Sequence, residues 1–360
     1  MIIFPNDQNV MDLTKRKVLL GLSGGVDSAA AAALLLEQGC DVTALTLWTW
    51  PDSAWNDPRL KRAAHSAKIL GLKHIVLDVR REFHDNVIDP FIRDWKVGQT
   101  SNPCVTCNAT LKFQKLRAIA DELGCDYFAT GHYARLTGSE SGRFLMRARY
   151  RDQDQSYFLY RLTQSLLDRL IFPLGEKNKQ DTRAIASMSQ DPVAGVKDSQ
   201  DICFLESGNL KDFLKKRGLS EKTGSFLNRS GQVIGEHKGS WLFTVGQRRR
   251  LGQSFGKRMT VLSINHTRNA VVLGDEEDAL MYEMALHDVV YLTSLSQMFG
   301  AEVQLRSQGT TYSASVTMAS DKQQAVVRFE KPVRLSSPGQ SAVFYDGDRV
   351  IGGGIVGEMT

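Results

Sequence analysis

The chain has 360 residues, of which 42% are hydrophobic and 24% charged, as is typical of a soluble globular protein of two or three domains. The formal net charge of +5 is small for a nucleic-acid binder, so any such site must be a local basic patch. Five scattered cysteines exclude a disulfide scaffold, and no apolar run approaches the roughly 20 residues of a membrane span. The first sixteen residues predict no signal peptide, so we expect a cytoplasmic protein without membrane contact.

Strand and helix patterns alternate in the first third of the sequence. The predicted strands are residues 17–22, 42–48, 74–79 and 126–130, and the predicted helices are residues 27–38, 57–71, 82–95 and 110–123. We expect Pro90 to kink or break the third helix, because proline lacks the N–H that an interior turn needs. Repeated β-α units predict an α/β fold with a doubly wound parallel sheet, in which ligands bind beyond the carboxyl ends of the strands.

The remaining sequence predicts two further parts. Helices are expected at residues 164–189, with a break at 172–175, and at 209–216, followed by a hairpin turn at 228–231 and a strand at 241–245. Beyond about residue 285, short alternating segments at 301–305, 312–318, 324–329 and 341–344 predict a small β-barrel or sandwich. We therefore expect a first, α/β domain over residues 1–206, a small α+β middle domain over 207–278 and a C-terminal β-barrel over 279–360.

The segment Ser23-Gly24-Gly25-Val26-Asp27-Ser28 lies between the first predicted strand and the first predicted helix. Its glycines allow backbone N–H groups to approach a ligand, and the helix N-terminus adds positive partial charge, so the segment predicts an anion site. Asp27 can cap the helix or hold a metal ion. The pattern is not that of the usual P-loop; it resembles the pyrophosphate loop of ATP pyrophosphatases, which cleave ATP to AMP and pyrophosphate. An ordinary strand–turn–helix corner would leave these polar groups without a role.

Three of the five cysteines stand where cysteine chemistry is expected. Cys104 and Cys107 form a Cys-x-x-Cys pair on a loop before a helix, where a helix N-terminus favours thiolates, and Cys203 lies between polar and apolar flanks. Three interpretations stay open: thiol chemistry through a persulfide and a resolving cysteine, an iron–sulfur or zinc site with three ligands, or a structural role. Cys40 and Cys125 each follow a helix-ending glycine, so we expect them to be buried, unreactive thiols.

Seven motifs, in one order between about residues 17 and 355, resemble those of the bacterial tRNA-specific 2-thiouridylases (MnmA/TrmU family). They are Gly21-Leu22-Ser23-Gly24-Gly25-Val26-Asp27-Ser28, Asn102-Pro103-x-x-x-Cys107-Asn108, Gly131-His132-Tyr133, Asp154-Gln155-Ser156-Tyr157-Phe158-Leu159, Asp198-Ser199 with Ile202-Cys203-Phe204, Gly246-Gln247-Arg248 and Pro338-Gly339-Gln340-Ser341-Ala342-Val343. The resemblance implies that the first domain is an ATP pyrophosphatase domain of the adenine nucleotide hydrolase-like type.

The resemblance also implies roles for single residues. For ATP binding it implies Gly21, Leu22, Ser23, Gly24, Gly25, Val26, Asp27, Ser28, Leu47 and Gly131. For contact with the target base or with tRNA it implies Asn102, Pro103, Cys104, His132, Gln153, Asp154, Gln155, Arg306 and Gln340. Cys107 matches the first catalytic cysteine and Cys203 the cysteine that carries the persulfide, whereas an iron–sulfur cluster would use both of them together with Cys104. Without the family, His132 could simply pack, Asp154-Gln155 could cap a helix and Gln340 could fill a turn.

The reaction implied by the resemblance uses ATP and Mg²⁺ to adenylate the C2 oxygen of wobble uridine 34 in tRNAs for Lys, Glu and Gln. Sulfur from a cysteine persulfide then gives 2-thiouridine, with AMP and pyrophosphate as products. The implied partners are tRNA and a sulfur donor, either a cysteine desulfurase or a relay protein, and the free protein is expected to be a monomer. The alternatives are another adenylating enzyme, such as a tRNA lysidine synthetase or an amide-forming ligase, and a tRNA-binding protein with a relic loop.

Two positions depart from the family pattern. Some members carry Asp where this chain has Cys104, and a thiol with an ordinary pKa of about 8.5 would need a lowered pKa to act as a general base. The basic-aromatic stretch of the C-terminal barrel is reduced to Arg306. A second basic run, Arg248-Arg249-Arg250 with Lys257-Arg258, is either solvated surface or a phosphate contact. We expect the loop around Cys203, over residues 195–205, to be mobile and to order when tRNA binds.

Overall fold

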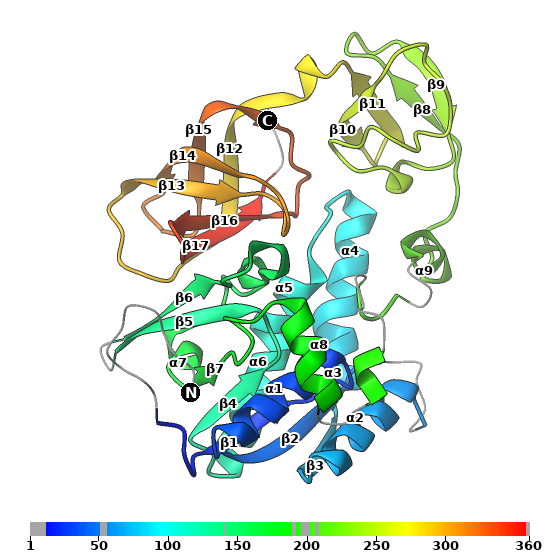
Figure 1. Cartoon of the computed structure of the whole chain (residues 1–360). Helices are drawn as coiled ribbons and strands as arrows, with labels where there is room; N and C mark the ends of the chain where they lie inside the picture. The colour runs from blue at the N-terminus through cyan, green and yellow to red at the C-terminus, as the bar shows by residue number, and fades with distance from the viewer. Residues whose placement is uncertain are drawn as a thin grey trace. The chain divides into compact units, whose positions relative to one another are not determined.

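The computed structural model describes residues 12–50, 56–139, 142–188, 192–195, 202–205 and 209–357. The chain divides into two compact units, whose elements are labelled in Figure 1. The first unit comprises Met1–Val87, Cys104–Gln200 and Gly347–Ile351, and the second comprises Ile88–Pro103, Asp201–Asp346 and Gly352–Thr360. No helix in the described part of the chain is long and apolar enough to cross a membrane.

A five-stranded parallel sheet forms the centre of the first unit (Figure 1). Its strands in spatial order are β3 (Lys73–Asp78), β2 (Asp41–Trp48), β1 (Lys17–Gly21), β4 (Tyr127–Thr130) and β7 (Leu170–Ile171). The sequence of β1 is apolar because a parallel sheet is covered on both faces, and Val18, Leu19 and Leu20 are all fully buried. The strand order reverses direction between β1 and β4, which is where such sheets bind ligands.

The described residues of the first unit also form helices. They are α1 (Val26–Glu37), α2 (Pro58–Ile69), α3 (Arg80–Phe83), α5 (Pro103–Cys107), α6 (Phe113–Glu122), α7 (Gln164–Leu167) and α8 (Lys179–Met188), with 3-10 turns at Arg151–Gln153, Ser156–Phe158 and Pro192–Gly195 and π-helical turns at His84–Ile88 and Asn108–Lys112. The alanine-rich α1 is buried along most of its length and packs against α8 as well as the sheet. A hairpin of β5 (Ala134–Ser139) and β6 (Gly142–Arg147) completes the unit.

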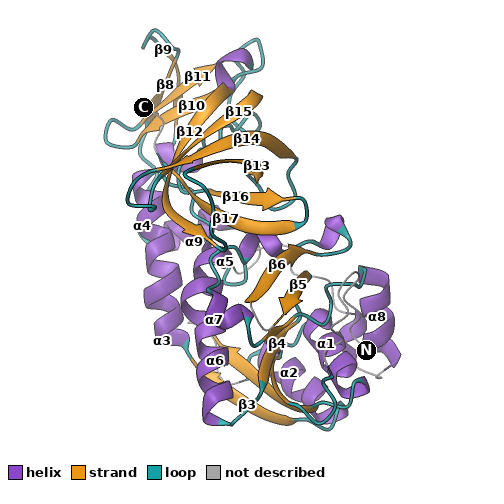
Figure 2. Ribbon diagram, turned by 90° about the vertical axis from the view of Figure 1, so that its left-hand side faces the viewer, coloured by secondary structure: helices purple, strands orange, loops and turns teal. Residues whose placement is uncertain are grey.

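The second unit contains α4 (Asp89–Val97), α9 (Leu210–Lys216) and two β structures, drawn as orange strands in Figure 2. The smaller is a sheet in the order β10 (Thr260–Asn265), β11 (Ala270–Gly274), β8 (Gly224–Leu227) and β9 (Val233–His237). The larger is a closed barrel in the order β12 (Leu280–Tyr291), β15 (Ala325–Arg334), β14 (Thr311–Met318), β13 (Met298–Gln304), β16 (Ser341–Asp346) and β17 (Arg349–Val356). Pairing of β17 with β12 closes it, so no strand edge is left open. Short 3-10 turns lie at Ser240–Leu242 and Glu277–Ala279.

The predicted architecture is confirmed in its main elements. The doubly wound parallel sheet is present, and the C-terminal strands form a barrel rather than a sandwich. Asp57 caps α2 by accepting a hydrogen bond from the N–H of Arg59, and Pro58 occupies the first turn as expected. The predicted turn at residues 228–231 joins the antiparallel strands β8 and β9.

Two local predictions were wrong, and a third was confirmed. Residues 170–171 form a strand rather than helix, because their backbone pairs with β4, a tertiary contact that two residues cannot announce in sequence. No strand forms at the described residues 241–245: Ser240–Leu242 are a 3-10 turn and Phe243 follows it, and Trp241 and Phe243 are apolar because both are buried. The interruption expected at Pro90 is present: the predicted helix is divided into α3, the π-helical turn His84–Ile88 and α4, and Pro90 lies in the first turn of α4, where its missing N–H is tolerated.

Candidate active site

The loop between β1 and α1 has the geometry of an anion cradle. Gly24 has φ +75°, and a Cβ there would lie 2.5 Å from the carbonyl oxygen of Arg59, so the position requires glycine. The N-cap residue of α1 is Gly25, which has no side chain that could cap the first turn. Backbone N–H groups of that turn therefore remain available to a ligand. Ser28 Oγ accepts from the N–H of Ser23 at 3.1 Å and donates to the carbonyl of Gly25 at 2.9 Å, which fixes the turn.

The end of β4 meets this loop. A Cβ on Gly131 would lie 2.8 Å from the carbonyl carbon of Asp27, so the two segments are in direct backbone contact. The structure thus brings together the predicted ATP-binding residues 21–28 and Gly131 at the carboxyl ends of β1 and β4. Leu47 is half-buried in the neighbouring strand β2, near its carboxyl end.

A hydrogen-bonded cluster holds the carboxylate of Asp27. Lys179 Nζ contacts its two oxygens at 2.7 and 3.0 Å, and the Tyr133 hydroxyl donates to it at 2.8 Å. The same hydroxyl lies 3.0 Å from Thr182 Oγ1 on α8. Sequence reasoning missed Lys179 and gave Tyr133 no role. The available signal was a lysine at the start of a helix that follows the Pro173–Gly175 break, a pattern too weak to select it.

Positive charge also borders the cradle from α2. Arg62 Nε donates to the carbonyl of Gly24 at 3.1 Å, and the guanidinium of Arg59 stacks on the Trp50 ring at 3.6 Å. Lys179 and Arg62 therefore place two cations at the loop whose backbone N–H groups face a ligand. This arrangement suits the phosphates of a nucleotide, because it combines backbone donors with positively charged side chains.

The cysteine pair lies on α5. Cys104 and Cys107 are half-buried, and burial raises the pKa of both thiols, while the ammonium of Lys112 opposes that rise. Lys112 comes one turn later, at the end of the π-helical segment Asn108–Lys112, and a backbone hydrogen bond from it also lowers the pKa of Cys107. Neither thiol is an ordinary general base at neutral pH, and Cys107 has the stronger support for its thiolate.

The other cysteines divide as expected. Cys40 and Cys125 are buried, and burial raises the pKa of each, which confirms the prediction of core thiols. Cys203, in the second unit, is exposed. Its neighbour Phe204 is buried between Phe91 and Phe213, with ring centroids at 5.5 and 5.2 Å, so the residue next to Cys203 is anchored. The motif residues Asp198 and Ser199, and most of the predicted mobile loop 195–205, lie outside the described residues.

His132 lies just beyond β4. Its Nδ1 is 2.7 Å from the hydroxyl of Thr130, and its ring lies 5.7 Å from that of Phe113 and 6.1 Å from that of Phe172. Burial holds the pKa of His132 well below its usual range, and the charge of Lys112 adds to the effect. The ring is therefore neutral at physiological pH, so it can donate or accept a hydrogen bond but does not offer a positive charge to RNA.

The turn containing the next predicted tRNA contacts is built on a buried carboxylate. Asp154 is 6% exposed; it pairs with Arg147 at 3.1 Å and accepts from the Ala148 N–H at 2.8 Å. Gln155 Oε1 accepts from the N–H of Tyr133 at 3.0 Å, which ties this turn to the segment after β4. Gln153 is half-buried. The carboxylate of Asp154 therefore holds the turn in place.

In the second unit, the loop before α5 and the loop after β15 are joined. The N–H of Thr100 donates to the carbonyl of Pro338 at 2.7 Å, and the hydroxyls of Thr100 and Ser337 lie 3.0 Å apart. Gln340 Nε2 donates to the carbonyl of Thr100. The structure therefore brings Gln340 next to the segment that continues into Asn102 and Pro103, which the sequence gave as separate sites. Arg306 is exposed after β13, away from this pair of loops in the sequence.

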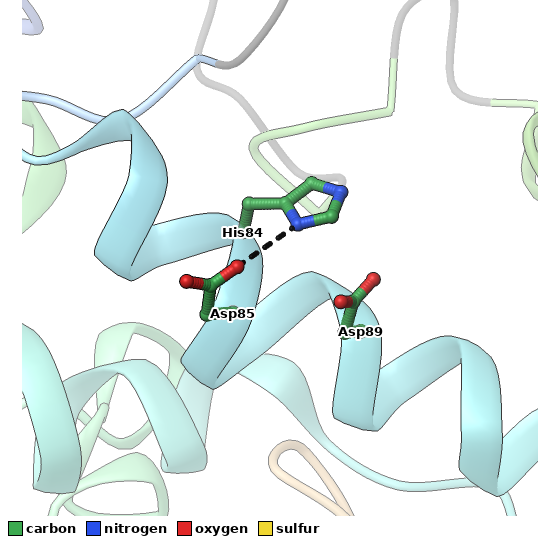
Figure 3. Close-up of side chains that lie close together, drawn as sticks. All are labelled: His84, Asp85 and Asp89. Carbon is green, nitrogen blue, oxygen red and sulfur yellow. Dashed lines mark hydrogen bonds and ion pairs between the residues drawn. The ribbon is translucent and has the colours of Figure 1, made fainter.

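Figure 3 shows a different cluster, at the π-helical turn His84–Ile88. His84 Nδ1 lies 3.4 Å from an Asp85 oxygen, and Asp89 begins α4. Histidine and carboxylates are ligand types for metal ions, but exposed groups of this kind are common without one. We assign this cluster no role in the reaction.

Comparison with known proteins gives matches over almost the whole chain. Residues 16–207 match the family model "tRNA methyl transferase HUP domain", residues 211–275 the "tRNA methyl transferase PRC-barrel domain" and residues 281–356 the "Aminomethyltransferase beta-barrel domain". The tRNA-specific 2-thiouridylase MnmA of Acidithiobacillus ferrooxidans is 41% identical over 347 residues, covering 95% of this chain and 98% of the relative. The protein of the same name from Nostoc punctiforme is 40% identical over 352 residues, with coverage of 96% and 100%. A solved 4-thiouridine synthetase–RNA complex with bound ATP aligns over 56% of this chain and 50% of that chain at 17% identity, with a TM-score of only 0.37.

Proposed function

The chain belongs to the family of tRNA-specific 2-thiouridylases, and from this premise we propose that it converts uridine 34 of tRNA to 2-thiouridine. The substrates are the tRNAs for Lys, Glu and Gln, together with ATP and a persulfide sulfur. The C2 oxygen of uridine is a poor leaving group, and transfer of AMP to it makes its departure easy. The products are thiolated tRNA, AMP and pyrophosphate.

The cluster around Asp27 is the observation that carries the first step. Lys179 and the free backbone N–H groups of α1 suit the phosphates of ATP, because each places positive charge or a donor at the same loop. Mg²⁺ fits this site, since Asp27 would supply an oxygen ligand and the ion would offset phosphate charge. Tyr133 and Thr182 hold Asp27 and α8 in place through their hydroxyls.

Recognition of RNA is proposed for the polar groups around the cysteine pair and the loops of the second unit. The residues are Asn102, Pro103 and Cys104 for the target base and His132, Gln153, Asp154, Gln155, Arg306 and Gln340 for the remaining tRNA. For Asp154 the burial of the carboxylate supports an indirect role, through the position of Gln153 and Gln155. An anticodon-loop base is cheap to unstack, so uridine 34 can leave its stack for the reaction.

Sulfur transfer is proposed for Cys203 and Cys107. The exposed Cys203 suits loading by a large donor, a cysteine desulfurase or a relay protein, because a protein can reach its sulfur. The outer sulfur of its persulfide attacks C2 and AMP leaves. The Cys107 thiolate then attacks the Cys203 sulfur, which breaks the S–S bond, frees the 2-thiouridine sulfur and leaves a Cys107–Cys203 disulfide for reduction. Alternatively, Cys107 first releases sulfide, which attacks C2 itself.

Two alternatives remain within this proposal. An iron–sulfur cluster could replace the persulfide; Cys104 and Cys107, two thiols on one helical turn, would then be ligands with Cys203. A different adenylating enzyme of the same superfamily would not need the distant cysteine pair. We further propose three domains, over residues 1–206, 207–278 and 279–360, and a monomeric, cytoplasmic protein in the free state.

Nucleoside mass spectrometry tests the function directly. Unmodified tRNA is incubated with anaerobically purified, metal-analysed protein, ATP, Mg²⁺ and a persulfide donor, with Cys107→Ser and Cys203→Ser in parallel and Cys125→Ser as the control. We expect ATP-dependent 2-thiouridine at position 34, lost in both test variants, unchanged in the control and independent of iron. Activity only after cluster reconstitution would make the cysteines ligands, and activity in Cys107→Ser would favour another adenylating enzyme.

A further inference from the structure

The second unit contains a cavity of about 580 Å³ lined largely by arginines. The arginines come from four separate places in the sequence and are Arg248, Arg249, Arg258, Arg306 and Arg334. Glu276 is the single acidic residue of the lining. The volume is within the roughly 300–1,000 Å³ that is usual for ligand sites. Five guanidinium groups facing one carboxylate leave a large excess of positive charge in a small space.

Side-chain amides of a half-buried and a buried glutamine hold the loops that carry these arginines. Gln247 Oε1 accepts from the N–H of Thr244 at 3.1 Å, and its Nε2 donates to the carbonyl of Arg249 at 2.9 Å. Gln304, only 2% exposed, donates through Nε2 to the carbonyls of Arg306 and Ser307 at 2.8 and 2.9 Å. These hydrogen bonds hold the backbone of the Arg248–Arg249 loop and of the Arg306 loop in place, although most of the guanidinium groups are exposed.

Glu276 bridges two of the arginines. Its two oxygens accept from Arg248 Nη1 and Nη2 at 3.0 Å each, and Arg334 also donates to it. The Arg248 side chain is 24% exposed, whereas Glu276 is 55% and Arg334 is 56% exposed. An ion pair that is open to water is weak, because solvent screens it. A carboxylate in this position mimics a phosphate, since both accept two hydrogen bonds from a guanidinium fork.

We propose that this cavity binds consecutive phosphates of the tRNA backbone, and that Glu276 occupies the guanidinium groups of Arg248 and Arg334 until a phosphate displaces it. The inference rests on the proposed function for the identity of the RNA. Arginine forks suit phosphates better than bases alone, and phosphate contacts position an RNA without reading its sequence. Glu276 then has a second effect: it lowers the affinity for any anion, so that only a ligand with several phosphates at the right spacing gains enough to replace it.

The test is tRNA affinity of the full-length protein as a function of salt, for Glu276→Gln and Arg334→Gln. Each variant has a matched control in the barrel, because Arg328 and Glu283 form a comparable exposed pair, 2.6 Å apart, that does not line the cavity. We expect Arg334→Gln to weaken binding about three- to tenfold and to reduce the salt slope by roughly 0.7–0.9. Glu276→Gln should tighten binding and steepen the slope, and Glu283→Gln and Arg328→Gln should change neither.

Several outcomes would overturn the proposal. Glu276→Gln that weakens binding, or that acts like Glu283→Gln, would show that Glu276 does not compete with RNA. If Arg334→Gln alters only the binding of free tripolyphosphate, measured by calorimetry, the cavity is a small-anion site and not a backbone site. Thiouridine formation by the wild-type protein at saturating tRNA separates this inference from the proposed function: a wild-type protein that forms thiouridine, with variants whose salt slopes are unchanged, would overturn the cavity assignment alone. If the wild-type protein forms no thiouridine but the variants change the salt slopes as expected, the proposed function is wrong and the cavity assignment is supported.

Discussion

Replacing Lys179 by methionine tests whether the cluster at Asp27 serves ATP. Two unit charges about 3 Å apart attract by roughly 5 kcal/mol at an effective dielectric of about 20. The Lys179 and Asp27 side chains are 21% and 30% exposed, however, so screening and desolvation leave a net stability contribution of about 1 kcal/mol. A charge-assisted bond from Lys179 to a phosphate would contribute about 1.5–3 kcal/mol, which corresponds to a roughly ten- to hundredfold change in kcat/KM.

We therefore expect Lys179→Met to lower kcat/KM for ATP by one to two orders of magnitude while the protein unfolds at nearly the wild-type temperature. The assay is tRNA-dependent pyrophosphate release with saturating Mg²⁺ and varied ATP. Lys177→Met makes the same chemical change two residues earlier and serves as the control. A kcat/KM within twofold of that control would refute the reasoning. So would recovery of activity in the double variant Asp27→Asn/Lys179→Met, because it would mean that Lys179 only neutralises Asp27.

Three further predictions concern the cysteines and the buried ion pair. Cys107→Ser and Cys203→Ser should each abolish 2-thiouridine yet retain tRNA-dependent pyrophosphate release, and loss of both activities together would contradict separate steps. Because burial raises the pKa of Cys107, sulfur transfer should speed up as pH rises above neutrality, and Lys112→Met should move that single-turnover profile to still higher pH; an unmoved profile would exclude Lys112 as the counter-charge. Asp154→Asn should lower the free energy of unfolding by about 3 kcal/mol in urea titrations, since Arg147 would keep a buried charge without its carboxylate, and a loss under 1 kcal/mol would argue against this.

The sequence was sufficient to predict the anion-binding loop Ser23–Ser28, but not to predict the side chains of Lys179 and Tyr133 that contact it. Ser23–Ser28 is readable because its chemistry is local: a strand, two glycines and a helix N-terminus follow one another directly. Lys179 and Tyr133 reach the same carboxylate from α8 and from the end of β4, so only the packing of α1 on α8 reveals them. Local signals carry no information on which distant side chain enters a site.

The same limit explains the errors in the fold. A two-residue strand such as Leu170–Ile171 is defined by its pairing with β4, and a segment of two residues is too short to show the alternating pattern of a strand. Trp241 and Phe243 alternate as in a strand, yet Ser240–Leu242 form a 3-10 turn, and the Trp241 indole donates to the carbonyl of Ser220 at 3.0 Å. In the opposite direction, Asp154 looked like a contact residue in sequence, whereas 6% exposure and four accepted hydrogen bonds make it a support for its neighbours.

Each of the two units contains a carboxylate paired with basic side chains that could bind phosphate, and we expect its removal to have opposite effects in the two units. In each, a carboxylate occupies cations that suit phosphate: Asp27 holds Lys179, and Glu276 holds Arg248 and Arg334. Glu276 has no further task in the cavity, so its neutralisation should only remove a competitor and tighten RNA binding. Asp27 is also the proposed oxygen ligand for Mg²⁺, so Asp27→Asn should free Lys179 and still weaken productive ATP binding. Opposite signs for the two substitutions, in tRNA affinity and in kcat/KM for ATP, are therefore expected; tighter and faster use of ATP by Asp27→Asn would mean that this carboxylate too is only a stand-in for phosphate.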